Sequence, residues 1–282
     1  MLTGQALCKN IRGCAPRKGE CALWWMGQAG FIVKLGRTVM GLDLFLSPHA
    51  GRLIPALLKP DDLADVALVF GTHDHRDHID RPAWPAIARA APAALFVVPA
   101  ALLPRLAADL RLPQERFVGL DDGAFAEING IRVMGIAAAH EFLDRDPITG
   151  HYPYLGYIIE ANGFRLFHAG DSCVYEGLQT KLSRWPLDLA LLPINGRDAA
   201  RLAANCIGNM TYQEAADLAG ALGPGATIPT HYDMFAKNSE NPQLFLDYLR
   251  VKYPRLKTTL CRHGERMILR AAKRPDRNRS DS

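Results

Sequence analysis

The fold of this chain is decided by one segment, Thr72-His73-Asp74-His75-Arg76-Asp77-His78-Ile79-Asp80. It follows Gly71 and the mostly apolar run 65–70, and such a run is typical of a buried β-strand. Three histidines and several carboxylates at the end of a strand are not core packing, because burying a polar group without a partner costs roughly 2–7 kcal/mol. We therefore interpret the segment as a metal-binding loop, with a solvated charged loop as the alternative.

The spacing within this loop supplies ligands for two neighbouring metal ions. His73 and His75 alternate on extended backbone and can converge on one ion, whereas Asp77 and His78 lie where the chain turns into a helix. The positive N-terminal end of that helix disfavours protonated histidine, so it favours the neutral form that binds metal. These residues are enough to begin two adjacent metal sites.

Three more candidate ligands each follow an apolar run that we predict to be a strand: His140, Asp171 and His231. One such residue alone is more often structural than functional. Together with the loop 72–80, the three favour a single metal centre built where strands end.

The rest of the chain alternates short apolar runs with a smaller number of helical patterns. The dipeptides Asn129-Gly130 and Asn162-Gly163 predict β-hairpins. Thr211 and Glu214 form a capping-box pattern, which predicts a helix over residues 212–222. Groups of strands with helices between them favour an α/β sandwich of two sheets flanked by helices.

Composition narrows the class of protein. The chain has 282 residues, of which 49% are hydrophobic and 22% charged, and this excludes disordered and fibrous proteins. A net charge of +4 without a dense basic stripe does not favour a nucleic-acid partner. The uncharged stretch 90–104 is too short, and too interrupted by prolines, to span a bilayer. We expect a soluble cytoplasmic protein with no membrane partner.

The six cysteines form no Cys-x-x-Cys pair, so we expect unpaired thiols rather than a disulfide framework. The alternative is a metal site at Cys8, Cys14 and Cys21.

The loop resembles the His-x-His-x-Asp-His signature of the metallo-β-lactamase superfamily, and the later ligands follow in that superfamily's order. The resemblance covers residues 23 to about 269 and implies a four-layered αββα sandwich with mixed sheets. We expect an N-terminal extension over residues 1–22, one domain over 23–271 and a disordered polar tail over 272–282. The implied metal roles divide the ligands into three sets: His73, His75 and His140 for the first ion, Asp77, His78 and His231 for the second, and Asp171 as the bridge.

A finer resemblance is to the L-ascorbate-6-phosphate lactonase-like branch. It rests on Trp24-Trp25-Met26-Gly27, on Thr72-His73-Asp74-His75 with Asp77-His78-Ile79-Asp80, on His168-Ala169-Gly170-Asp171-Ser172, and on Ile228-Pro229-Thr230-His231-Tyr232-Asp233 with Asn241-Pro242 after it. That branch implies a cytosolic metal-dependent lactonase, often manganese-using, that tends to oligomerise. This chain looks shorter and keeps His140, a position at which the branch varies, so the exact substrate does not transfer.

We therefore expect a hydrolase that uses a metal-bridged hydroxide to open a sugar lactone, with or without a phosphate. Two divalent ions, zinc or manganese with iron as a further option, are the expected cofactors. Asp77 and Asp171 are the predicted catalytic carboxylates. The alternatives are a phosphodiesterase or thioesterase of the same fold, and a non-catalytic metal-binding sensor.

The predicted substrate residues lie after the strand expected at 187–192. Arg197 could bind a phosphate or carboxylate of a small-molecule substrate, or it could pair with Asp198 on the surface. Three asparagines could bind substrate hydroxyls: Asn195, Asn205 and Asn209. Asp43 and His168 are candidates for hydrogen bonds that orient metal-bound ligands.

Overall fold

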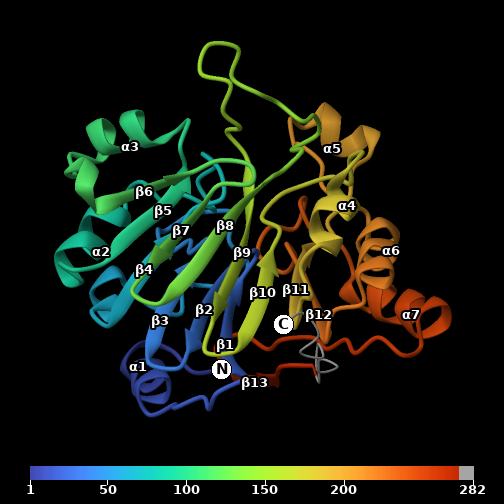
Figure 1. The fold of residues 1–282 in the computed structure, drawn as a ribbon, viewed down its shortest axis with the longest axis horizontal. Coiled ribbons are helices and arrows are strands. Elements are labelled where there is room, and N and C mark those ends of the chain that lie inside the picture. Colours follow the sequence, from blue (N-terminus) through green and yellow to red (C-terminus); the bar gives the residue numbers. More distant parts are fainter. Residues whose placement is uncertain (273–282) are drawn as a thin grey trace, which may run out of the picture.

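The computed structural model describes residues 1–272, which fold around two β-sheets packed face to face (Figure 1). The strands of the larger sheet are β1 (Glu20–Gly27), β2 (Gly30–Leu35), β3 (Thr38–Leu42), β4 (Val66–Phe70), β5 (Leu95–Pro99), β6 (Phe117–Leu120) and β13 (Arg266–Arg270). Those of the smaller sheet are β7 (Phe125–Ile128), β8 (Ile131–Ala137), β9 (Leu155–Ala161), β10 (Phe164–His168), β11 (Leu189–Pro193) and β12 (Ala226–Thr230). The strand orders are β13-β1-β2-β3-β4-β5-β6 and β12-β11-β10-β9-β8-β7, and both sheets mix parallel and antiparallel pairs.

Helices cover the outer face of each sheet (Figure 1). The helices of the first half of the chain are α1 (Gly4–Arg12), η1 (Pro60–Leu63), α2 (Trp84–Ala90), α3 (Leu103–Leu110) and η2 (Gln114–Arg116). Those of the second half are α4 (Leu178–Ser183), α5 (Ala199–Ala203), α6 (Tyr212–Leu222) and α7 (Pro242–Lys252). Trp84 of α2 packs in one cluster with Trp24 and Val69, while Phe70 packs with Ile136 between the sheets. The expected four-layered αββα sandwich with mixed sheets is confirmed.

Strand β1 shows why a continuous apolar run forms here. Leu23 and Trp25 belong to the cluster between the sheets, whereas Ala22 and Trp24 belong to the cluster under the helices. A strand that is buried on both faces needs apolar residues at every position rather than at alternate ones.

Several local predictions are confirmed. The Asn129-Gly130 and Asn162-Gly163 turns connect β7 to β8 and β9 to β10 as antiparallel hairpins. The Thr211 and Glu214 capping box begins α6. The residues 257–261 also have a strand-like sequence, but that expectation is wrong, because the structure has only an isolated bridge there, between Thr227 and Thr258.

The structure also describes the segment before the expected domain and the first residue after it. Within residues 1–22, Leu7, Cys8 and Ile11 of α1 are buried in the cluster under the larger sheet. Ala272 donates its backbone N–H to Asp188 at 3.0 Å, and the remainder of the expected tail lies outside the described residues. Every helix within residues 1–272 is too short or too polar to cross a lipid bilayer.

The alternative of a metal site at the three N-terminal cysteines is not formed in the described residues. Cys8 and Cys14 pack on the helix side of the larger sheet, whereas Cys21 packs between the sheets. These three are not among the ligand groups found within residues 1–272.

The strand ends that carry the polar loops lie at one edge of the sandwich. Strands β3 and β4 pair in parallel, as do β10, β11 and β12, so their carboxyl ends point the same way. The long loop between β8 and β9 rises from this edge, and α5 lies beside it (Figure 1). The fold therefore delivers loops from both sheets to one place.

Candidate metal centre

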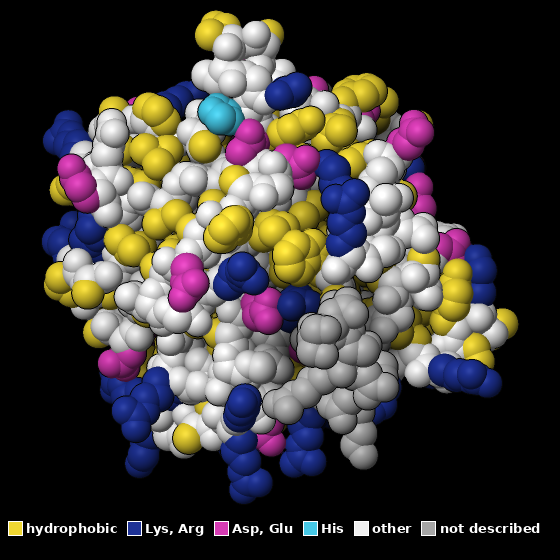
Figure 2. Space-filling view, viewed as in Figure 1, with side chains coloured by type: hydrophobic (Ala, Val, Ile, Leu, Met, Phe, Trp, Pro, Cys, Tyr) yellow, Lys and Arg dark blue, Asp and Glu magenta, His cyan; other side chains and the backbone are white. Residues whose placement is uncertain are grey.

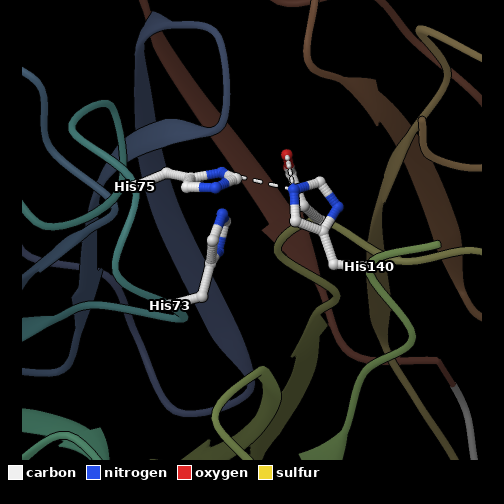
Figure 3. A group of neighbouring side chains, drawn as sticks. His73, His75 and His140 are labelled. Carbon is white, nitrogen blue, oxygen red and sulfur yellow. Dashed lines mark hydrogen bonds and ion pairs between the residues drawn. The ribbon is translucent and has the colours of Figure 1, made fainter. Parts of the chain in front are cut away.

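The seven predicted metal ligands lie together at this edge in two neighbouring groups. The first consists of His73, His75, His140 and Asp171, and the second of Asp77, His78 and His231, with the ligand atoms of each group within 4.8 Å of one another. Figure 3 shows His73 and His75 approaching from one segment and His140 from another, with their rings converging. His140 Nε2 lies 3.2 Å from His75 Nδ1.

Asp171 lies between the two groups. Its Oδ1 is 3.3 Å from His78 Nε2, and its Oδ2 is 3.1 Å from His231 Nε2 and 3.9 Å from His140 Nε2. Gly170 allows this approach, because its φ of +59° is left-handed and a Cβ would lie 2.7 Å from Thr72. One carboxylate therefore contacts ligands of both groups.

The donor atoms fit divalent metal ions. His73 Nε2 is buried and has no hydrogen-bond partner within residues 1–272, and His78 Nε2 and Asp171 Oδ1 have none there besides their mutual contact at 3.3 Å. Leaving such atoms unsatisfied costs about 1–3 kcal/mol each, and a bound cation would remove that cost. Imidazole suits zinc and iron, and carboxylate oxygens also suit manganese.

The protonation states of the first group favour metal binding. Burial lowers the pKa of His73 and His75, and it lowers the pKa of His140 to about 4. These imidazoles are therefore neutral at pH 7, which is the form that binds a metal ion. Burial acts to raise the pKa of Asp171, but the neighbouring His231 and His78 hold it well below its usual range.

A buried carboxylate lies behind the second group, as the sequence predicted. Asp43 Oδ2 is 2.7 Å from His78 Nδ1, and it also accepts a hydrogen bond from Thr72 Oγ1 at 2.8 Å. The contact with Asp43 therefore fixes the His78 ring with Nε2 toward the metal centre.

The predicted contact of His168 with a metal ligand is wrong, because its Nε2 lies 2.9 Å from Asp43 instead.

The centre opens to solvent on one side. His75 and Asp77 are partly exposed, whereas the other ligands are buried. The Tyr154 ring lies 5.6 Å from the His73 ring and 5.4 Å from the His140 ring, so it forms part of the wall. The solvent-facing side of the centre is therefore the side of His75 and Asp77.

The predicted substrate residues have partners of their own. Asn209 Nδ2 donates to Asn195 Oδ1 at 3.0 Å, and both side chains are buried. Asn195 Nδ2 in turn donates to Asn238 at 2.6 Å. Asn205 follows α5, is exposed, and has a left-handed φ of +54°.

Arg197 pairs with an unexpected carboxylate. Its two Nη atoms donate to both oxygens of Glu214, at 2.6 and 2.7 Å. The alternative pairing with Asp198 is wrong, because Asp198 caps α5 and pairs with Arg201. Glu214 is also the acidic residue of the α6 capping box, and the sequence carries no signal that it has a second partner 17 positions away.

One residue in contact with the centre was missed by the sequence analysis. Gln28 lies in the turn between β1 and β2, and its side chain contacts Asp77 and His231. The sequence carries no signal for it, because the run 23–35 predicts one continuous strand and the turn has no Asn-Gly or Asp-Gly pair.

The fold and the ligand set define a metal-dependent hydrolase of the metallo-β-lactamase fold. Residues 38–232 match the family model described as the β-lactamase superfamily domain, and the chain belongs to this superfamily. It is 26% identical over 251 residues to a UPF0173 metal-dependent hydrolase of Pyrococcus abyssi, covering 87% of this chain and 98% of that protein. A UPF0173 metal-dependent hydrolase of Nitratidesulfovibrio vulgaris is 28% identical over 256 residues, covering 89% and 96%.

A solved structure shares the fold. Igni18, a metallo hydrolase from Ignicoccus hospitalis, superposes with a TM-score of 0.67 at 21% identity, covering 90% of this chain and 100% of that one.

Proposed function

We propose that this protein is a two-metal hydrolase that opens the ester ring of a sugar lactone. The observation that carries the two-metal part is the position of Asp171, whose oxygens lie 3.3 Å from His78 Nε2 and 3.1 Å from His231 Nε2 while it also belongs to the first ligand group. A carboxylate in this position is suited to hold two ions close together. Two such ions, when bound, polarise a carbonyl and activate water at neutral pH.

The chain's own residues would bind the metal ions, orient the substrate and accept a proton. The neutral histidines of the first group and the ionised Asp171 provide the charge balance that two cations need. Asp77 is a carboxylate of the centre with a side chain 19% exposed, so it is positioned to accept a proton from an entering water molecule. Tyr154 would pack against the ring of the substrate.

The lactone class is supported by the segments that resemble the L-ascorbate-6-phosphate lactonase-like branch. We propose an unphosphorylated lactone ahead of a phosphorylated one, because the guanidinium of Arg197, which could have bound a phosphate, is held by Glu214. The phosphorylated lactone, a phosphodiester and a thioester are the competing substrates.

A hydrolysis panel tests the proposal. Protein reconstituted separately with Mn(II) and Zn(II) would be given a plain sugar lactone, a phosphorylated one, a phosphodiester and a thioester, with Asp171→Asn as the blank. We expect ring opening of the plain lactone, lost in the blank. Hydrolysis of the phosphodiester alone, or no ring opening by protein that carries two ions, would reject the lactone.

We further propose a small-molecule substrate, a cytoplasmic location and a homo-oligomeric state. The last is supported by the β8–β9 loop, where Phe142 and Ile148 are 68% and 93% exposed and hydrophobic side chains reach the tip (Figure 2). Contact with a second copy would bury them. Light scattering on wild-type protein and on Phe142→Ser/Ile148→Ser would show a larger assembly that the double variant weakens.

A further inference from the structure

We infer that Gln28 is a positioning residue for the second metal ion, through its contacts with Asp77 and His231. The inference rests on the two-metal centre proposed above and adds a residue that belongs to neither ligand group. Gln28 is 1% exposed, so its side-chain amide is buried in the protein interior.

The side-chain amide contacts both ligands directly. Gln28 Nε2 donates to Asp77 Oδ2 at 3.3 Å and lies 3.1 and 3.2 Å from the two ring nitrogens of His231. Nearly equal distances to both nitrogens mean that the amide lies across the imidazole rather than in line with either nitrogen. It therefore restricts rotation of the His231 ring while it holds the Asp77 carboxylate.

The backbone of the same residue holds His231 as well. The Gln28 carbonyl accepts hydrogen bonds from the His231 backbone N–H at 3.1 Å and from the Trp25 indole at 3.0 Å. His231 follows β12 of the smaller sheet, whereas Asp77 follows β4 of the larger one. Gln28 thus fixes the separation of two ligands that different sheets deliver.

Two features of Gln28 are energetically unfavourable. Gln28 has a left-handed φ of +54°, which is unfavourable for a residue other than glycine. Its Oε1 is buried without a hydrogen-bond partner within residues 1–272. A glutamine that served only the packing of the turn would be replaceable by a residue with neither cost, so the contacts with the ligands are the feature that explains it.

The two metal sites should respond differently to loss of this amide. The first group has His73 and His75 on one short loop with His140 beside them, and Gln28 contacts none of these. The second group depends on Asp77 and His231, which Gln28 joins. Loss of a group that orients metal ligands typically weakens metal binding about 10–100-fold.

Cobalt titration of the metal-free full chain tests the inference. The visible absorption of Co(II) would be followed in wild type, in Gln28→Met, which keeps the side-chain length without the amide, and in Gln243→Met as a matched control. Gln243 is an exposed glutamine of α7 whose amide donates to Asp247 at 2.8 Å. We expect Gln28→Met to raise the Kd of the second ion about tenfold or more. The Kd of the first ion should stay within about twofold of wild type, and Gln243→Met should match wild type at both sites.

A second variant protects the test against misfolding. Gln28→Asn suits the left-handed backbone but is one methylene too short to reach both ligands, so it should show the same selective loss. Unchanged second-ion binding in a folded Gln28 variant would overturn this inference and leave the proposed function intact. Wild-type protein that binds fewer than two ions would overturn both.

Discussion

Oδ2 of Asp43 lies 2.7 Å from Nδ1 of His78, and both side chains are fully buried. Burial alone would raise the pKa of Asp43, yet the neighbouring His78 and His168 hold it at about 2. Asp43 also accepts a hydrogen bond from the Thr72 backbone N–H at 2.9 Å, so it joins the end of β3 to the start of the metal-binding loop. The orientation of a ligand histidine is therefore set by a residue 35 positions away in the chain.

Replacing this carboxylate should weaken the second metal site. Asp43→Asn keeps the size of the side chain but removes the charge that pairs with His78, so we expect metal affinity to fall about 10–100-fold. Isothermal titration of metal-free protein with Zn(II) measures it. Asp247→Asn, which changes an exposed carboxylate of α7, is the control. Equal affinities in the two variants would contradict a role for Asp43 in orienting His78.

Removing the shared carboxylate should reduce the number of bound ions. We expect wild type to bind two ions per chain and Asp171→Asn to retain at most one. The Asp171 carboxylate serves both ligand groups, and the asparagine replaces its negative charge with a neutral amide. Elemental analysis after dialysis counts the ions. Metal at 100 times its Kd should stabilise wild type by about 2.7 kcal/mol, and this gain should shrink in the variant. Two tightly held ions in Asp171→Asn would exclude a bridging role.

The cysteines should differ sharply in reactivity. Five are buried, and burial raises the pKa of Cys21 and raises that of Cys261 to about 12, so few thiolates form at pH 8. Cys206 is partly exposed and should be the single thiol that a disulfide reagent modifies quickly in native protein. Denatured protein should show all six. Fast modification that survives in Cys206→Ser would mean that another cysteine is accessible.

Arg197→Ala separates a structural role from a substrate-binding one. Because both Nη atoms already bond Glu214, we expect a stability loss of about 0.2–1 kcal/mol, the usual range for an exposed ion pair. The KM for a phosphorylated lactone should stay within about twofold of wild type. Thermal unfolding and steady-state kinetics give the two values. A tenfold rise in KM with unchanged stability would restore the anion-binding role that the sequence suggested.

The sequence predicted the candidate metal ligands because they carry local signals. His73, His75, Asp77 and His78 lie within one short loop after an apolar strand, and a strand end is where buried backbone gives way to polar side chains. The same local reasoning predicted the β9–β10 hairpin and the start of α6, since turns and helix caps depend on residues a few positions apart.

Local signals did not predict the weaker elements. Helix α1 was not expected, because Thr3 makes no side-chain cap and the helix is stabilised by burying Leu7, Cys8 and Ile11 on the larger sheet. The residues of β7 carry no strand pattern of their own, because Phe125 and Glu127 are exposed, and the strand depends on the Asn129-Gly130 turn and on its pairing with β8. Both elements depend on partners that the local sequence does not reveal.

The sequence by itself determined the ligand types, the order in which strands deliver them, and hence the class of fold and of chemistry. Tertiary structure alone decided which polar groups meet: Arg197 with Glu214, His168 with Asp43, and Gln28 with Asp77 and His231. These partners lie up to 203 positions apart. Their meeting depends on the path of the whole chain and on left-handed backbone at Gln28 and Asp43, which the glutamine does not signal.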